Sequence, residues 1–125
     1  MKQLGFFFDA RRCNGCKTCV VACKDAHNLS VGRNFRHVLE VTDGKWSKDP
    51  KSGAWKQNVY AYYLSIACNH CSDPACVKAC PQRALEFGDI EELRKKHGNV
   101  DTIYPLPQPA ATHPNLVIHA PLKHP

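Results

Sequence analysis

No stretch of this sequence approaches the length of a membrane-spanning helix. Such a helix needs roughly 18 or more consecutive apolar residues, and the longest apolar runs here are far shorter. The N-terminus reaches Asp9 after only a few apolar residues, so it does not resemble a secretory signal peptide. Arg11 and Arg12 lead into cysteines rather than into an apolar region, which argues against a twin-arginine signal. We therefore expect no transmembrane segment and no export signal in these residues.

Two other patterns are missing. Basic and aromatic residues do not alternate in a patch of the kind that binds nucleic acid, although the formal net charge is +6. There is also no grouping of a nucleophile, a base and an orienting acid that would indicate substrate chemistry. We therefore predict a protein that is not an enzyme and that does not bind nucleic acid.

What the sequence does have is 8 cysteines, all of them in two short runs. The first cysteine run consists of Cys13, Cys16, Cys19 and Cys23, and the second consists of Cys68, Cys71, Cys76 and Cys80, followed by Pro81. Disulfides within so few residues would be crowded, and nothing indicates secretion. The Cys-x2-Cys pairs could instead supply structural Zn–S4 sites, but such sites do not usually need further cysteines so close by.

The spacing of the first run is typical of iron–sulfur proteins. Bacterial ferredoxins hold [4Fe-4S] clusters with Cys-x2-Cys-x2-Cys-x3-Cys-Pro, and here only the final proline is replaced, by Lys24. The second run has the same arrangement, with its third cysteine two residues later. Three thiolates of a tight loop can bind one cluster, while the fourth, a helical turn further on, points toward another. We predict that cluster one is held by Cys13, Cys16, Cys19 and Cys80, and cluster two by Cys68, Cys71, Cys76 and Cys23.

Two clusters would also account for much of the positive charge. A four-thiolate [4Fe-4S] cluster carries a charge of about −2 when oxidised, so two clusters would offset most of the excess of basic residues. The candidates to balance this charge are the basic residues nearest the cysteines in the sequence: Arg11, Arg12, Lys17, Lys24, Lys78 and Arg83.

The remaining patterns predict a small α+β fold. Residues 5–8 indicate a strand and residues 17–27 a short helix. Between the cysteine runs, residues 28–66 are expected to form a strand insertion, with strands at 35–41 and 58–66. Trp46 and Trp55 are expected to pack in a hairpin or in the core. Asp73 and Pro74 are typical of a helix start, which would place Cys76 and Cys80 on one helical face.

The C-terminal third divides at Tyr104. Residues 89–97 have the capping and charge pattern of a helix that ends at Gly98. Beyond Tyr104 lie six of the 9 prolines, and proline cannot supply the backbone donors of helices and central strands. We therefore predict a ferredoxin-like dicluster domain over residues 1–104 and an extended, proline-rich arm over residues 105–125.

Stretches well beyond the cysteine spacing carry a family resemblance. They are GFFFD (5–9), RCNGCKTC (12–19), ACKD (22–25), QNVYAYYLSI (57–66), CNHC (68–71), DPAC (73–76), RAL (83–85) and EELRKKHG (91–98). Together they resemble the electron-transfer (B) subunit of anaerobic dimethyl sulfoxide reductases. That family has four cysteine motifs and four [4Fe-4S] clusters. Here the sequence up to about Cys80 resembles the first half of such a subunit, and the sequence after Pro81 resembles the part that follows the fourth motif.

The resemblance implies a function and partners. It implies an iron–sulfur subunit that relays electrons between a quinol-linked membrane anchor and a molybdopterin catalytic subunit, peripheral to the bacterial cytoplasmic membrane. Because the middle motifs are missing, the two cysteine runs have only each other to complete their clusters. Two alternatives stay open at this point: a free-standing dicluster ferredoxin of the cytoplasm, and a zinc-binding interaction module without a redox role.

Overall fold

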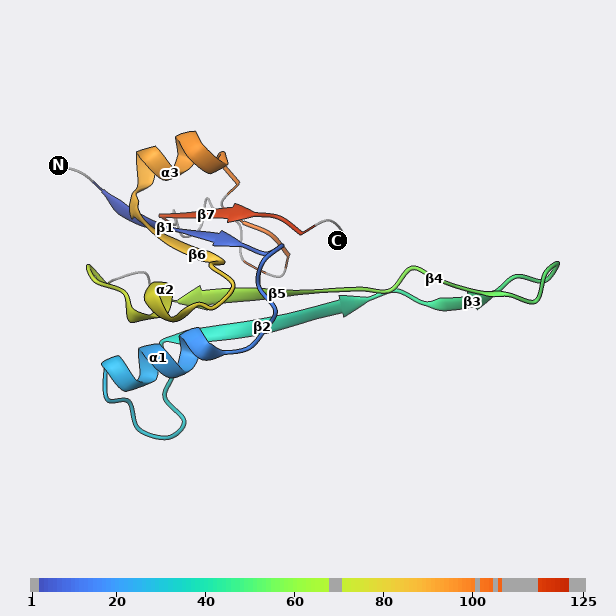
Figure 1. Ribbon diagram of the computed structural model, residues 1–125, viewed down its shortest axis with the longest axis horizontal. Helices are drawn as coiled ribbons and strands as arrows, with labels where there is room; N and C mark the ends of the chain where they lie inside the picture. Colours follow the sequence, from blue (N-terminus) through green and yellow to red (C-terminus); the bar gives the residue numbers. More distant parts are fainter. Residues whose placement is uncertain (1–2, 68–70, 101, 105, 107–114, 122–125) are drawn as a thin grey trace.

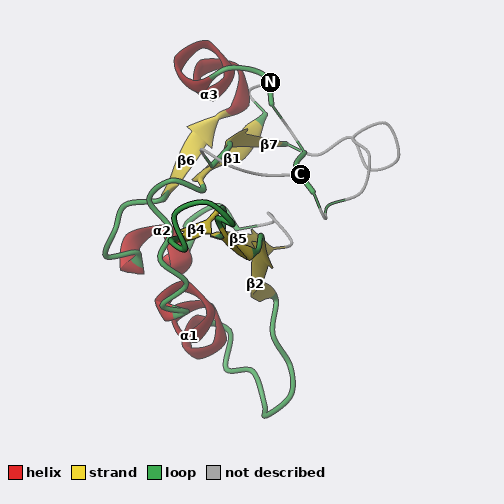
Figure 2. Cartoon of the chain, turned by 90° about the vertical axis from the view of Figure 1, so that its right-hand side faces the viewer, coloured by secondary structure: helices red, strands yellow, loops and turns green. Residues whose placement is uncertain are grey.

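The computed structural model describes residues 3–67, 71–100, 102–104, 106 and 115–121. Strands β1 (Leu4–Asp9), β6 (Leu85–Asp89) and β7 (Leu116–His119) form a sheet in the order β6-β1-β7. Helix α3 (Ile90–His97) lies on one side of this sheet, and the β2–β5 ribbon (Arg36–Asp43 and Tyr60–Ala67) lies on the other, with α1 (Thr18–Ala26) and α2 (Ala75–Ala79) near it (Figures 1 and 2). Within the described part of the chain, no helix has the length and apolar character needed to cross a bilayer.

Strand β1 is the centre of the fold because both of its faces are buried. Phe6 and Phe8 point to one face and join the larger core cluster, whereas Phe7 points to the other and packs with Ile90 of α3 and Val117 of β7. This alternation is the period-2 geometry of a strand. Burial of one such side chain stabilises the fold by about 1.5–3 kcal/mol, so the three phenylalanines anchor the sheet between its two covering layers.

The structure contains the elements predicted on either side of the cysteine runs. Strand β1 and helix α1 coincide closely with residues 5–8 and 17–27, and strands β2 and β5 with the two strands of the insertion. Helix α3 begins as predicted at Asp89, whose carboxylate accepts a hydrogen bond from Glu91 N at 2.8 Å. It ends at Gly98, which has a φ of 97°. The capping pattern was therefore sufficient to place this helix.

Helix α2 corrects the prediction made for the second cysteine run. Its N-cap is Pro74 rather than Asp73, and the Asp73 carboxylate instead forms an ion pair with Lys78 Nζ at 2.6 Å. The helix ends at Ala79, and Cys80 follows it with an extended backbone (φ −66°, ψ 113°). Proline disfavours the helical conformation in the residue before it, so Pro81 ends the helix here. Cys80 thus does not share a helical face with Cys76.

The predicted C-terminal arm also needs a correction where the structure describes it. Residues Leu116–His119 form β7, which pairs in parallel with β1 at the edge of the sheet. Val117 and Ile118 are 1% and 2% exposed, so this segment belongs to the core. It contains no proline, and an edge strand needs partners on one side only. Residues 105, 107–114 and 122–125 of the predicted arm lie outside the described residues.

The strand insertion is a long antiparallel ribbon. Strands β2 and β5 pair in register from Arg36 opposite Ala67 to Asp43 opposite Tyr60. The short strands β3 (Trp46–Lys48) and β4 (Trp55–Gln57) continue it away from the rest of the chain (Figure 1). Trp46 and Trp55 are 65% and 63% exposed and do not lie opposite each other in the register. Both tryptophans thus lie in a hairpin, one of the two expected placements, and the alternative that they pack in the core is wrong.

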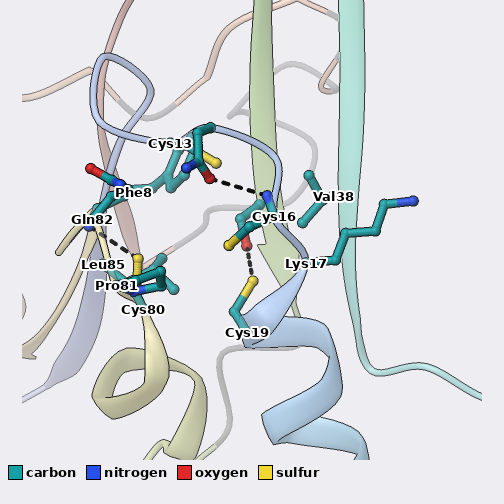
Figure 3. A pocket seen from close by; sticks show the side chains of 13 residues that line it. Phe8, Cys13, Cys16, Lys17, Cys19, Val38, Cys80, Pro81, Gln82 and Leu85 are labelled. Carbon is teal, nitrogen blue, oxygen red and sulfur yellow. Dashed lines mark hydrogen bonds between the residues drawn. The ribbon is translucent and has the colours of Figure 1, made fainter.

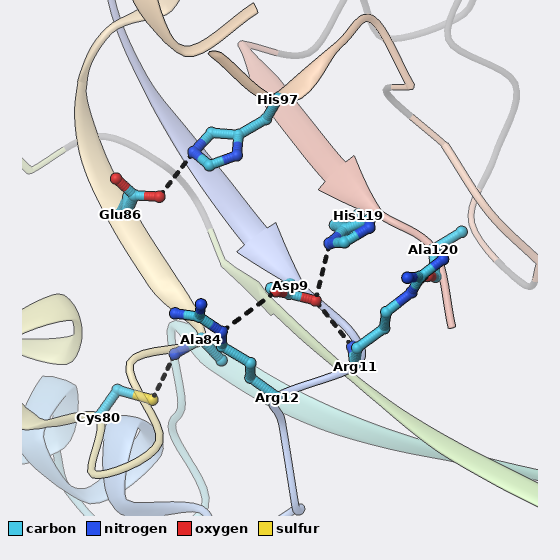
Figure 4. Close-up of polar contacts among 9 residues, drawn as sticks. All are labelled: Asp9, Arg11, Arg12, Cys80, Ala84, Glu86, His97, His119 and Ala120. Carbon is cyan, nitrogen blue, oxygen red and sulfur yellow. Dashed lines mark hydrogen bonds and ion pairs between the residues drawn. The ribbon is translucent and has the colours of Figure 1, made fainter. Parts of the chain in front are cut away.

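Buried contacts of Asp9 hold the end of β1 in place. Its carboxylate, 7% exposed as a residue, accepts a hydrogen bond from Arg11 N at 2.9 Å (Figure 4). It also lies 3.5 Å from Arg12 Nε and 3.3 Å from His119 Nδ1. The backbone N–H of Asp9 donates to the Ala84 carbonyl at 2.8 Å. These contacts tie together the end of β1, the start of β6 and the end of β7.

Gly15 allows the first cysteine run to lie against the ribbon. Its φ of +75° is a conformation that L side chains rarely adopt, and an added Cβ would lie 2.6 Å from ring carbons of Tyr63. Gly53, at the far end of the ribbon, has a similar φ of +71°, but an added Cβ there would meet only Lys48 Cε at 4.0 Å. A comparison of substitutions at these two glycines therefore separates the cost of backbone strain from the cost of steric overlap with Tyr63.

We predict that Gly15→Ala lowers the free energy of unfolding by about 2–4 kcal/mol, because left-handed strain and overpacking add. The control variant Gly53→Ala should lose only the strain contribution, about 1–2 kcal/mol. Thermal or denaturant unfolding of both variants under the same conditions measures the difference. Equal losses in the two variants would show that the Tyr63 ring does not constrain this loop.

Candidate metal centre

The antiparallel pairing of β1 with β6 brings parts of the two cysteine runs together. Strand β1 ends at Asp9, shortly before Cys13, and β6 begins at Leu85, shortly after Cys80. Phe8 lies opposite Leu85 in the register. The loop that leaves β1 and the loop that enters β6 therefore lie at the same end of the sheet, although they are far apart in the sequence.

Four thiols surround one cavity at this end of the sheet. Cys13, Cys16 and Cys19 of the first run and Cys80 of the second all line it (Figure 3). The remaining lining residues come from β1, the ribbon and the loops that carry the cysteines: Phe8, Asn14, Lys17, Val38, Ser65, Pro81, Gln82, Ala84 and Leu85. These are the four cysteines that the sequence analysis assigned to cluster one.

The local sequence explains how the first three thiols converge. The side-chain carbonyl of Asn14 accepts a hydrogen bond from Cys16 N at 3.2 Å, which closes a tight turn around Gly15. Lys17 also has a positive φ, 63°, and helix α1 starts directly after it. Cys19 therefore lies in the first turn of α1, where it is buried. The loop presents two thiols and the helix a third to the same cavity.

The surroundings of Cys13 and Cys16 shift the pKa values of these two thiols in opposite directions. Burial raises the pKa of Cys13; a backbone hydrogen bond from Gly15 opposes this effect, and the charges of Cys19, Cys80 and Cys16 raise the pKa further. The pKa of Cys16 is lowered, chiefly by its hydrogen bond with Thr18 Oγ1, 3.2 Å away. Like charges so close together disfavour each other's ionisation. Four thiolates in one cavity therefore require a positively charged group between them, and bound iron supplies such a charge.

Two further hydrogen bonds reach the sulfurs from other parts of the chain. Ala84 N donates to Cys80 Sγ at 3.3 Å (Figure 4). Ser65 Oγ lies 3.2 Å from Cys19 Sγ and accepts a hydrogen bond from Arg36 Nη1 at 2.8 Å. Hydrogen bonds of this kind orient metal ligands and tune the metal. No local pattern in the sequence singled out Ser65 or Arg36, although strand alternation puts both side chains on the same face of the ribbon as Val38.

The chemistry and environment of these thiols fit an iron–sulfur cluster. Arg36 is 2% exposed, and its Nε has no hydrogen-bond partner among the described residues. A buried cation next to a cavity lined by thiols suits an anionic cluster. Within the described part of the chain, no three His, Cys, Asp or Glu side chains are close enough to hold a single ion. In a cubane cluster, by contrast, each thiolate binds a different iron, so the ligands stand further apart.

Three of the four ligands predicted for cluster two, Cys23, Cys71 and Cys76, lie on or near helices α1 and α2, which pack against each other. Cys23 of α1 and Cys76 of α2 are both buried. Cys71 Sγ lies 3.5 Å from Nε2 of His27, at the end of α1. Cys68 lies outside the described residues. Among the cysteines that the structure describes, none is joined to another by a disulfide.

The basic residues proposed to balance cluster charge are mostly in solvent. Arg11, Arg12, Lys17, Lys78 and Arg83 are exposed and Lys24 is half-buried. Several have other partners: Arg12 contacts Asp9, Lys78 contacts Asp73, and Lys24 donates to two backbone carbonyls. Proximity to the cysteines in the sequence was therefore a poor guide to which basic residues balance the charge of the clusters, because water screens exposed charges. The buried basic side chain is instead that of Arg36, which lies between the two cysteine runs in the sequence.

Comparison with known proteins identifies the family to which this protein belongs. The sequence matches the model of the 4Fe-4S dicluster domain over residues 12–85, a range that contains all 8 cysteines. It is 37% identical, over 182 aligned positions, to a probable anaerobic dimethyl sulfoxide reductase subunit of Escherichia coli (strain K12), covering 93% of this protein and 88% of the relative. It is 35% identical to the B subunit of the anaerobic dimethyl sulfoxide reductase of Haemophilus influenzae, covering 94% of this protein and 89% of the relative.

A shorter match extends to other iron–sulfur subunits. Over 79 aligned positions, 63% of this protein and 34% of the relative, the sequence is 42% identical to the formate dehydrogenase iron-sulfur subunit of Wolinella succinogenes. The 182 positions aligned with the Escherichia coli relative exceed the 125 residues present here, so stretches inside that relative have no counterpart in this sequence. The protein therefore belongs, as an internally shortened member, to the 4Fe-4S dicluster family that includes the B subunits of anaerobic dimethyl sulfoxide reductases.

Proposed function

We propose that this protein is a non-catalytic electron-transfer subunit that holds two [4Fe-4S] clusters. The observation that carries the proposal is the cavity lined by Cys13, Cys16, Cys19 and Cys80, because thiols of both cysteine runs meet there. Cluster one takes these four ligands. Cluster two takes Cys68, Cys71, Cys76 and Cys23. When bound, each cluster supplies one-electron redox chemistry.

The residues of the protein hold and insulate the clusters. Phe8, Val38 and Leu85 give the cavity an apolar wall, which excludes water from the cluster and strengthens the electrostatic effects of nearby groups. Helix α1 contributes Cys19 to cluster one and Cys23 to cluster two. These residues are four apart, so they lie one helical turn and about 6 Å apart along the axis. A shared helix therefore keeps the two clusters close enough to exchange electrons.

The relatives suggest the partners of the protein. Two of them are subunits of anaerobic dimethyl sulfoxide reductases and a third is a subunit of a formate dehydrogenase. We propose that this protein likewise passes electrons from a quinol-linked membrane anchor to a molybdopterin catalytic subunit, and that it lies peripheral to the cytoplasmic membrane as part of that complex.

The cofactor content tests the first part of the proposal. Protein purified without oxygen should be brown, bleach on addition of dithionite and contain about eight irons per molecule. Iron, acid-labile sulfide and zinc are measured on the same sample. A colourless protein loaded with zinc would contradict the proposal and favour a zinc-binding module.

Paired cysteine variants test which ligands share a cluster. Each single variant, Cys13→Ala, Cys76→Ala or Cys80→Ala, should lose one cluster and keep about four irons. If Cys80 completes cluster one, the double variant Cys13→Ala/Cys80→Ala should also keep about four irons. The control Cys76→Ala/Cys80→Ala should lose both clusters, because its two positions belong to different clusters.

The reverse pattern would overturn the crossed assignment. If each cluster used only its own run, Cys76→Ala/Cys80→Ala would keep half of the iron and Cys13→Ala/Cys80→Ala would lose nearly all of it. Folded protein is confirmed for each variant by circular dichroism before iron is counted.

Isolation from the native host tests the partners. Tagged protein should co-purify from detergent-treated membranes with molybdenum in near-equal amount, and a quinol analogue should reduce its clusters in that preparation. Recovery of the protein from the soluble fraction without molybdenum, with its clusters loaded, would instead favour a free-standing dicluster ferredoxin.

A further inference from the structure

We propose that Arg36, acting through Ser65, sets the reduction potential of cluster one. This inference rests on the proposed function, since it assumes that Cys19 is a cluster ligand. It assigns a role to a side chain whose hydrogen bond goes to Ser65 rather than to a cysteine. Arg36 is therefore a positioning and tuning residue, and its charge reaches the Cys19 sulfur through a hydroxyl.

The backbone of the ribbon directs Arg36 and Ser65 toward the cavity. Val38 lies opposite Ser65 in the register of β2 and β5, and both line the cavity. Arg36 is two residues before Val38 on the same strand, so its side chain starts from the same face. On the other face of β5, Leu64 is fully buried in the core. The ribbon thus turns an apolar face to the core and a face with Ser65 and Arg36 to the thiols.

The hydrogen bonds along this path have a single possible direction. Arginine can only donate, so Arg36 Nη1 donates to Ser65 Oγ at 2.8 Å. A cluster-bound thiolate can only accept, so the Ser65 hydroxyl, 3.2 Å from Cys19 Sγ, donates to it. A hydroxyl that accepts from a cation becomes a stronger donor, because consecutive hydrogen bonds polarise one another. Ser65 therefore transmits part of the positive charge of Arg36 to the sulfur.

The charge of Arg36 is close and poorly screened. The two hydrogen bonds limit the separation of Nη1 from Cys19 Sγ to their combined length, about 6 Å, a range in which opposite charges stabilise each other strongly. Arg36 is 2% exposed, and among the described residues no carboxylate forms an ion pair with it. A buried guanidinium without a counterion is costly. An anionic cluster beside it removes that cost, and reduction, which adds a negative charge, increases the attraction.

These charges give the direction in which the reduction potential of cluster one should shift. The positive charge and the hydrogen bond favour the reduced cluster over the oxidised one, so removing either should make cluster one harder to reduce. The potential of cluster two should change less, because the hydrogen bonds from Arg36 to Ser65 and from Ser65 lead to Cys19, a ligand of cluster one. The arrangement makes cluster one a better electron acceptor than it would be without Arg36.

Anaerobic redox titration followed by electron paramagnetic resonance tests the proposal. Cluster one is recognised as the signal that is lost in Cys13→Ala. In Arg36→Gln, the ratio of reduced to oxidised cluster one at a fixed potential should fall about tenfold, which is a shift of about 59 mV for a one-electron couple. Ser65→Ala should shift this ratio in the same direction. The double variant should shift the potential by less than the sum of the two single shifts, because both substitutions interrupt the same chain of hydrogen bonds. Arg36→Lys, which keeps the charge, should recover part of the loss.

Lys17→Gln is the matched control. Lys17 also lines the cavity but is exposed, so its charge is screened by water and salt. Its variant should shift the ratio less than about twofold, and that shift should vanish in high salt, whereas the effect of Arg36→Gln should persist.

The outcomes separate this proposal from the proposed function. Loaded Arg36→Gln and Ser65→Ala proteins whose cluster one has the wild-type potential would overturn the role of Arg36 and leave the electron-transfer function intact. If Arg36→Gln does not assemble cluster one, Ser65→Ala alone decides, since it removes only a hydroxyl. Wild-type protein without clusters would contradict the proposed function itself.

Discussion

The end of strand β1 lies beside the start of strand β6, and this pairing governs the geometry of the cysteine-bearing loops. The loops that leave and enter the paired strands carry Cys13 and Cys80. The backbone hydrogen bond from Asp9 to Ala84, and the contacts of the Asp9 carboxylate, lock that junction. The alternating burial of Phe6, Phe7 and Phe8 holds β1 between two layers, so the position of the thiols depends on packing that lies outside the site.

The end of helix α2 explains why Cys80, a residue of the second cysteine run, lies with the first. Pro81 stops helix α2 before Cys80. The backbone of Cys80 is extended. It turns the chain away from helices α1 and α2, and the Cys80 side chain faces the first cysteine run. Cys76, which stays within α2, is buried and is not among the residues that line this cavity. The end of helix α2 at Ala79 thus leaves Cys80 outside the helix that contains Cys76.

Electrostatics is the second requirement of the site. Burial, and to a lesser degree the charges of the neighbouring thiols, raise the pKa of Cys13. Most basic residues near the cysteines in the sequence remain in water, where their charge is screened. The ribbon brings in the one basic side chain of the described residues that is fully buried, Arg36. The strand insertion thus contributes to the environment of the thiols as well as separating the two runs.

Much of the chemistry could be predicted from local sequence. Cysteine spacing indicates iron–sulfur ligands because a tight loop with two residues between thiols suits the corners of a cubane. Local patterns also predicted β1, α1, the ribbon and the capped helix α3, since strand alternation and capping depend on neighbouring residues only. Long-range packing settled the rest. It made residues 116–119 an edge strand of the sheet, left Trp46 and Trp55 in solvent, and placed Ser65 and Arg36 against Cys19. These outcomes depend on contacts between residues far apart in the sequence, and no local pattern encodes which distant segment a buried side chain will meet.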